Sequence, residues 1–247
     1  MTLNGSALHS TLIVFGAGGG LGRAICRSGT DAGRKVIAVS SQQPGSVREA
    51  AVWLHTPELG RESELARALS EAMSGLETKP LCAIITSGSN KTPLPITEAS
   101  ADDFEAAFRD NLLPALNAIS VLRHLNRTGL SIVVTGSVYS VDGASNNAPY
   151  VTAKHALAGL VRASAKDLRP EGISINLICP GPIRGDMLMR VLEARHGIDS
   201  AETSLHQLES ARQPRGLLEY SDVALAAIAL ADMGLVGVSG QLIVQDN

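Results

Sequence analysis

The sequence lacks the patterns that mark nucleic-acid-binding proteins, membrane proteins and secreted proteins. Its charges are scattered, the net charge is -3 and there is no basic stripe, so neither nucleic acid nor a membrane surface is an expected partner. The most apolar window, Val223–Val236, is too short to span a bilayer and contains Asp232. The first ten residues have neither a basic start nor an apolar run, so we expect no secretory signal.

Cysteine is also scarce, and histidine shows no pattern. The three cysteines, Cys26, Cys82 and Cys179, are widely spaced among apolar neighbours, which favours buried, reduced thiols. Reduced thiols are typical of the cytoplasm, so we expect a cytoplasmic protein. The six histidines have no metal-ligand spacing, and we expect no metal site.

What the sequence does contain is a regular alternation of apolar runs and helical stretches. Hydrophobic residues make up 45% of its 247 residues, enough for a packed core. Short, continuously apolar strands that alternate with helices indicate a parallel sheet covered on both faces. No linker or repeat interrupts the pattern, so we predict one doubly wound α/β domain of the Rossmann type over residues 1–247. We expect seven strands, at 11–15, 35–39, 50–54, 81–86, 131–135, 173–178 and 241–244. We expect helices at 23–32, 62–73, 101–123 (as two helices or one broken one), 148–168 and 221–231.

A glycine-rich loop follows the first expected strand. The sequence GAGGGLG places Gly16, Gly20 and Gly22 between an apolar strand and a helix, which presents backbone N–H groups and a helix N-terminus to a diphosphate. Gly16 permits the tight turn, and the other two glycines allow close approach of the backbone and the helix. Ligands of such sheets bind outside the carboxyl ends of the strands. The segments 16–22, 86–89 and 180–183 and Ser137 should therefore converge on one crevice.

Tyr150 and Lys154 are four residues apart on an expected helix, so they share one of its faces. A phenol normally loses its proton near pH 10, and a neighbouring ammonium would lower that value. The pair is then able to donate and accept a proton near neutral pH. Taken alone, the pair is more often a surface feature of an amphipathic helix. Ser137 alone would be a strand-end cap and Asn111 alone a helix cap, so the prediction of a site depends on their joint occurrence.

Together these features resemble the classical short-chain dehydrogenase/reductase family. The glycine spacing, Ser137 thirteen positions before Tyr150, Asn111 after the fourth strand and the turn Pro180–Gly181 after the sixth strand occur in the family's order. The resemblance covers nearly the whole chain. It implies an oxidoreductase that transfers a hydride between NAD(P) and a secondary alcohol or ketone.

The resemblance also implies a role for each residue. Tyr150 would be the general acid or base, and Lys154 would lower its pKa and bind the nicotinamide ribose. Ser137 would polarise the substrate oxygen, and Asn111 would distort its helix and order a water in a proton relay. The implied cofactor-binding residues are Gly16, Gly20, Leu21, Gly22, Ser40, Ser41, Gly88, Asn111, Tyr150, Lys154, Pro180, Gly181 and Ile183.

The chain departs from the family pattern in four places. Phe15 replaces the usual Thr before the first glycine. Only Gly88 remains of the usual N-N-A-G after the fourth strand, so the hydrogen bonds that steady the central sheet must be made differently. The family's Asp after the third strand has no clear counterpart, with His55 near its place. Gly185 stands where the family has a Thr that contacts the carboxamide.

The kind of nicotinamide cofactor depends on the end of the second strand. Ser40 and Ser41 stand there, and without an acidic residue a 2′-phosphate is not repelled. Arg23 and Arg48 could partner that phosphate, although both fit solvated surface arginines as well. We therefore expect NADP slightly more than NAD.

The substrate should be set by the segments 184–213, 89–95 and 138–147. The first, expected as a lid, carries many charges and no aromatic residue. This composition suggests a small or polar hydroxyl or keto substrate, anionic compounds included. Alternatively, the charges form the solvated face of a lid helix.

Two other functions stay open at this point. A dinucleotide-binding regulatory or structural subunit without catalysis would account for the departures in the glycine loop. A hydrolase with Ser137 as nucleophile is disfavoured, because Thr135 and Tyr139 occupy places where the nucleophile elbow needs glycine.

Family members commonly pack the helices expected at 102–123 and 148–168 between subunits, so the resemblance implies a homodimer or homotetramer.

Overall fold

The centre of the molecule is a parallel sheet. A computed structural model describes residues 10–41, 52–55, 62–74, 80–86, 88–91, 93–125 and 129–246. Within them, seven strands are arranged in the order β3-β2-β1-β4-β5-β6-β7, and all neighbours are parallel. The strands are β1 (Thr11–Phe15), β2 (Lys35–Ser40), β3 (Val52–His55), β4 (Leu81–Ile85), β5 (Leu130–Thr135), β6 (Ser174–Pro180) and β7 (Leu242–Gln245). The predicted fold class is confirmed. The third strand lies at 52–55 rather than 50–54, and residues 50 and 51 lie outside the described part.

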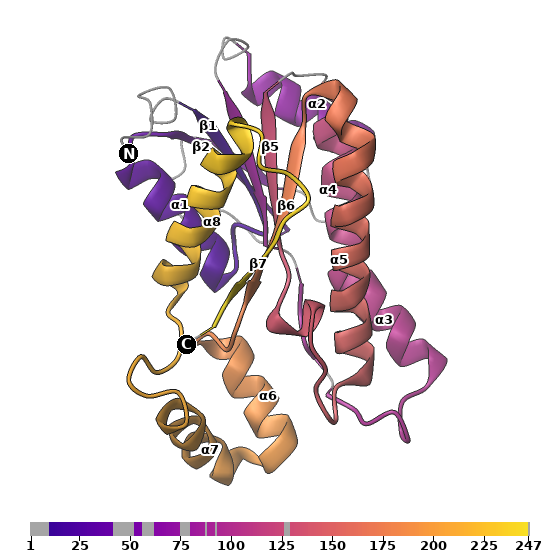
Figure 1. Cartoon of the computed structure of the whole chain (residues 1–247), viewed down its shortest axis with the longest axis vertical. Helices are drawn as coiled ribbons and strands as arrows, with labels where there is room; N and C mark the ends of the chain where they lie inside the picture. Colours follow the sequence, from indigo (N-terminus) through magenta and orange to yellow (C-terminus); the bar gives the residue numbers. More distant parts are fainter. Residues whose placement is uncertain are drawn as a thin grey trace.

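Helices cover both faces of the sheet (Figure 1). They are α1 (Gly20–Asp31), α2 (Glu62–Ala72), α3 (Ala101–Asn111), α4 (Leu113–His124), α5 (Ala148–Leu168), α6 (Asp186–His196), α7 (Ile198–Ser210) and α8 (Tyr220–Leu235). α1 and α8 lie side by side on one face, and α2, α4 and α5 lie on the other, with α3 against α5. The stretch 101–123 forms two helices, which meet at Leu112.

The continuous apolar runs are explained by burial on both faces. Successive side chains of a strand point to opposite faces of the sheet. In β1, Ile13 and Phe15 belong to the core on the α2, α4 and α5 side, whereas Leu12 and Val14 belong to the core on the α1 and α8 side. Neither face of this strand is solvated, so its sequence shows no alternation of apolar and polar residues.

The expected lid segment forms two helices, α6 and α7, at the carboxyl end of the sheet (Figure 1). Gly197 joins them with a φ of 82°, a conformation that favours glycine. The two ends of the segment meet at the sheet, since Ile183 and Leu218 form a short parallel bridge. Arg184 forms ion pairs with Glu209 and Glu219, which fasten α7 and the start of α8 to the end of β6.

The cysteines match the prediction, because Cys26, Cys82 and Cys179 are all buried and none of them forms a disulfide. Across the described ranges, no helix has the length and apolar character needed to cross a membrane. In the same ranges, no group of three or more His, Cys, Asp or Glu side chains could hold a metal ion.

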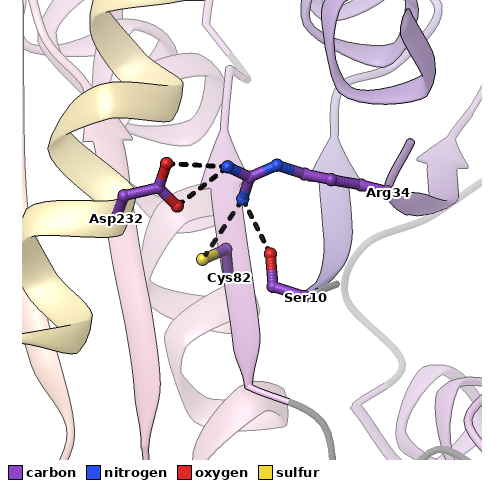
Figure 2. Close-up of polar contacts among 4 residues, drawn as sticks. All are labelled: Ser10, Arg34, Cys82 and Asp232. Carbon is purple, nitrogen blue, oxygen red and sulfur yellow. Dashed lines mark hydrogen bonds and ion pairs between the residues drawn. The ribbon is translucent and has the colours of Figure 1, made fainter. Parts of the chain in front are cut away.

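A buried ion pair joins the elements at the amino end of the sheet (Figure 2). The guanidinium of Arg34, just before β2, donates two hydrogen bonds to the carboxylate of Asp232 on α8, at 2.7 and 2.9 Å. It also donates to the Ser10 hydroxyl at 2.7 Å and lies 3.9 Å from the sulfur of Cys82. Burial raises the pKa of the Cys82 thiol to about 11, so this thiol stays protonated beside the pair. The side chains of Arg34 and Asp232 are only 4% and 8% exposed.

Removing one member of this pair should be costly. Asp232→Asn leaves the guanidinium buried without its counter-charge, and we expect it to lower the free energy of unfolding by about 3–5 kcal/mol, measured by urea denaturation. Glu71→Gln is the matched control, because the Arg67–Glu71 pair is exposed on α2 and should contribute about 0.3–0.5 kcal/mol. Equal losses in the two variants would contradict the structural role assigned to Asp232.

Candidate functional site

A cavity of about 670 Å³ lies at the carboxyl ends of the strands, a volume typical of a ligand pocket. The glycine loop, the segments after β4, β5 and β6, the start of α5 and the two lid helices all line it. The segments predicted to converge do so. The predicted site residues that line the cavity are Gly20, Leu21, Gly22, Gly88, Ser137, Tyr150, Lys154, Pro180, Gly181 and Ile183.

The glycine loop brings α1 directly against the end of β1. Gly16 turns the chain with a φ of 79°. A Cβ on Gly22 would overlap the carbonyl oxygen of Gly16, so only glycine allows this approach. The first turn of α1 carries no acidic side chain, and Gly19 caps it without a side chain. The free N–H groups at this helix start are thus available to an anion such as a diphosphate, and the loop fits a dinucleotide.

Thr86 stands in the segment 85–88, where the chain lacks most of the family's N-N-A-G, and it forms hydrogen bonds with the end of β1. Its hydroxyl contacts the carbonyl oxygens of Phe15 at 2.9 Å and Gly16 at 3.2 Å. Its backbone N–H donates to Phe15 as well. The end of β4 is therefore tied to the start of the glycine loop, across the two central strands. The sequence comparison with the family pattern marked this position only as a departure.

Tyr220, at the start of α8, was not predicted as a site residue. Its ring lies against Gly20 and Gly185, where an added Cβ at either glycine would overlap it. Tyr220 also lines the cavity. Gly185, which stands where the family has a Thr, thus makes room for a phenol from a distant part of the chain.

Asn111 does not line the cavity but supports the segment that does. Its side-chain N–H₂ donates to the carbonyl oxygens of Ser89 and Ala107, and its side-chain oxygen accepts from the Ser89 N–H. Asn111 is 1% exposed and is the last residue of α3. Its oxygen and the Lys154 ammonium both lie beside Gly88, which has a φ of 150°. In the structure this amide therefore holds the 88–89 backbone in place.

Tyr150 and Lys154 lie together in the cavity, but their protonation differs from the expectation. The Lys154 nitrogen is 5.5 Å from the centre of the Tyr150 ring, and the rings of Tyr139 and Tyr150 meet edge to face. Burial raises the pKa of Tyr150 to about 12, although a hydrogen bond with Ser137 acts to lower it. Burial likewise lowers the pKa of Lys154 to about 8. The expected lowering of the phenol pKa by the ammonium is wrong for this structure, because desolvation dominates for both groups.

The residues predicted to select the cofactor lie outside the cavity. Ser40 is buried at the end of β2, and Ser41 is exposed beside it. The Nε2 atom of His55 lies 3.1 Å from the Ser41 carbonyl oxygen. Arg23 donates a hydrogen bond to the carbonyl of Gly18, so it is bound to the glycine loop. Arg48 lies outside the described residues.

The lid turns its apolar side chains toward the cavity rather than most of its charges. Only Arg195 and Arg212 of its charged residues line the cavity, together with His196. Arg184 is held in its ion pairs with two glutamates. No aspartate or glutamate of the described chain lines the cavity. The apolar lid residues that line it are Met187, Leu188, Val191, Leu192 and Leu208.

The contact between Gly22 and Gly16 can be tested by stability. Gly22→Ala forces the backbone of the glycine loop to move, and we expect it to lower the free energy of unfolding by about 1–3 kcal/mol. Gly19→Ala is the control in the same loop, because its Cβ would meet the Gly16 carbonyl oxygen at an ordinary 3.5 Å. Urea denaturation of both variants decides the matter, and a Gly22→Ala variant as stable as Gly19→Ala would refute the contact.

The burial of Lys154 predicts a pH dependence of stability. Its pKa falls from 10.5 to about 8 on folding, so the unfolded chain binds more protons between these values and wild-type stability rises with pH there. Lys154→Met should therefore be more stable than wild type at pH 7, by on the order of 3 kcal/mol, and this difference should shrink from pH 8 to 10.5. Urea denaturation across this range measures it, with exposed Lys166→Met as control. A difference independent of pH would show that Lys154 is not desolvated.

Comparison with known proteins identifies the family. A family model described as short chain dehydrogenase matches residues 10–196. A 2,5-dichloro-2,5-cyclohexadiene-1,4-diol dehydrogenase of Sphingobium indicum is 28% identical over 96% of this chain and 95% of its own length. Protein FixR of Bradyrhizobium diazoefficiens is 34% identical over 74% of this chain and 70% of its own. L-fucose dehydrogenase of Rattus norvegicus is 27% identical over 89% of this chain and 82% of its own.

Solved structures share the fold. Aldohexose dehydrogenase of Thermoplasma acidophilum superposes with a TM-score of 0.83 at 22% identity, over 98% of this chain and 94% of that one. A tyrosine-to-phenylalanine variant of ElxO, solved with NADPH bound, superposes with a TM-score of 0.78 at 19% identity, over 96% and 97%. The family match over residues 10–196 goes further than the fold: this chain belongs to the short-chain dehydrogenase/reductase family and is one of its oxidoreductases.

Proposed function

We propose that this protein transfers a hydride between a nicotinamide dinucleotide and a secondary alcohol or ketone, with Tyr150 as the proton donor and acceptor. The observation that carries the proposal is the shared cavity of Tyr150, Lys154 and Ser137 with the glycine loop. The glycine loop would bind the diphosphate of the dinucleotide, and Tyr150 would supply a proton to the reacting oxygen of the substrate. The bound dinucleotide would supply the hydride, and the protein would supply orientation and proton transfer.

The protonation of the site suits reduction of a carbonyl. With its pKa raised to about 12 by burial, the Tyr150 phenol holds its proton and can donate it to a developing alkoxide. The Ser137 hydroxyl lies beside Tyr150 in the cavity, so it could donate a hydrogen bond to the same oxygen. For oxidation, Tyr150 must act as a base, and a protonated Lys154 beside its ring would favour the phenolate.

The predicted dinucleotide-binding residues divide into two groups. Residues that line the cavity would contact the dinucleotide: Gly20, Leu21, Gly22, Gly88, Tyr150, Lys154, Pro180, Gly181 and Ile183. The second group does not line the cavity and would support dinucleotide binding through the backbone or from the edge of the site: Gly16, Ser40, Ser41 and Asn111. The hydrogen bonds of Asn111 to Ser89 support a positioning role for this residue, in addition to the proposed proton relay.

We keep the slight preference for NADP over NAD as part of the proposal. β2 ends at Ser40 and is followed by Ser41, without an acidic residue at either position. The side chain of Arg23 is at the glycine loop, where it could approach a 2′-phosphate. The ElxO structure, which contains NADPH, supports a nicotinamide dinucleotide as the cofactor.

A small, polar hydroxyl or keto compound suits the cavity. Relatives are named for a cyclic diol and for L-fucose. Neutral polar residues line the cavity, and the lid adds apolar side chains and two arginines, so a compact ring or chain with oxygen substituents could fit. Arg195 and Arg212 would tolerate a negative charge on it.

Three further expectations accompany the proposal. The catalytically idle alternative is disfavoured by the joint presence of Ser137, Tyr150 and Lys154 in one cavity, since a subunit without catalysis has no chemical need for them. A homodimer or homotetramer is supported by Leu113 and Leu116 on α4, each 44% exposed. A cytoplasmic location is supported by the three buried thiols, none of which forms a disulfide.

Replacement of Tyr150 by Phe separates catalysis from binding. We expect Tyr150→Phe to reduce turnover by about 10²–10⁴-fold, while the dissociation constants of NADPH and NADH, measured by fluorescence titration, stay unchanged. Thr152→Ala, on the exposed side of the same helix, is the control and should retain turnover. A wild-type protein that binds the dinucleotide without turning over a broad panel of alcohols and ketones would favour the idle subunit instead.

A further inference from the structure

Asn147 is a buried amide in the cavity without a partner. The residue is 1% exposed and lines the cavity beside Tyr150. Neither its side-chain nitrogen nor its side-chain oxygen makes a hydrogen bond to any described residue. It precedes α5 as the N-cap, but its side chain makes no capping bond. A buried amide with both polar atoms unpaired is unfavourable, so the fold alone does not explain this side chain.

Hydrogen bonds hold the backbone on both sides of Asn147, so its side chain starts from a fixed place, while its amide remains free to rotate. Its carbonyl oxygen accepts the N–H of Val151, and the N–H of Ala148 donates to the carbonyl of Leu94, each at 3.0 Å. The terminal torsion of an asparagine is soft, so the amide can turn toward a ligand although the backbone is fixed.

The chemistry of the amide indicates the group that it binds. An amide offers a donor and an acceptor at once, and a hydroxyl group uses both, whereas a carboxylate uses only the donor. Asn147 is the N-cap and Tyr150 the third residue of α5, two positions whose side chains lie close together. Both line the cavity, so they can bind two oxygens on neighbouring carbons of one substrate. Neutral polar residues from other elements also line the cavity: Asn90, Ser204 and Gln207.

We propose that Asn147 binds a hydroxyl group on the carbon next to the reacting one, so that the substrate is a vicinal diol or an α-hydroxy ketone. The inference rests on the proposed function, because it takes Tyr150 as the site of reaction. Asn147 then determines specificity: a simple ketone leaves its amide unpaired, and an α-hydroxy ketone pairs it.

Two ketones and one substitution test the proposal. The full-length protein is assayed with NADPH and NADH on 2-hydroxycyclohexanone and on cyclohexanone. We expect wild type to prefer the hydroxy ketone and Asn147→Leu to lower its kcat/KM by about tenfold, mainly through KM, with little change for cyclohexanone. Asn146→Gly is the matched control, since Asn146 is an exposed neighbour with a φ of 55° that glycine also adopts.

A second readout distinguishes a structural role. Because its amide is buried and bonds to no described residue, Asn147→Leu should leave the melting temperature of the protein unchanged or raise it. A lower melting temperature together with equal losses on both ketones would overturn the proposal, as would a wild type without preference for the hydroxy ketone.

If neither ketone is turned over, the proposal is tested by measuring how alcohols bind to the protein. In the Tyr150→Phe protein with NADP⁺, saturation-transfer NMR compares cis-cyclohexane-1,2-diol with cyclohexanol. Tighter binding of the diol that Asn147→Leu abolishes would support the role of Asn147 even if the proposed reaction fails. Equal binding of the two alcohols, or a preference that survives Asn147→Leu, would refute it while leaving the proposed reaction untouched.

Discussion

The contact between Gly22 and the carbonyl of Gly16 sets the geometry of the whole cavity. Because no side chain stands between them, α1 begins directly at the end of β1 and turns its first N–H groups to the cavity. The Thr86 hydroxyl then binds the carbonyls of Phe15 and Gly16 and fixes the end of β4 at the same point. The chain leaves β1 toward one face of the sheet and β4 toward the other, so an opening forms between them.

Burial sets the chemistry of this opening. Lys154 is buried and Tyr150 is partly buried, and both shift toward their uncharged forms. A site that keeps a lysine in this state reduces the stability of the fold. The ion pair of Arg34 and Asp232 lies at the opposite end of the sheet and joins the same helix, α8, that reaches the cavity through Tyr220. The fold thus places its buried ion pair and its reactive groups at opposite ends.

The sequence predicted the features that depend on local pattern. Apolar runs located all seven strands, and the glycine spacing and the Tyr150–Lys154 spacing located residues that the structure brings into one cavity. Features that depend on long-range packing were missed. Tyr220 fills the space left by Gly185, 35 positions away, and nothing near either residue signals this contact. The phenol pKa was predicted in the wrong direction, because the burial of a side chain does not appear in its spacing.

The lid segment had the weakest sequence pattern, and in the structure its two ends are joined to each other. The lid segment begins after β6 and ends before α8, and Ile183 and Leu218 at its two ends pair with each other. Because the two ends of this segment lie together, the segment can change in length at little entropic cost. Such a change does not disturb the order of the strands. Exchange of this one segment would therefore change the lid side of the cavity and leave the glycine loop, Tyr150 and Lys154 in place.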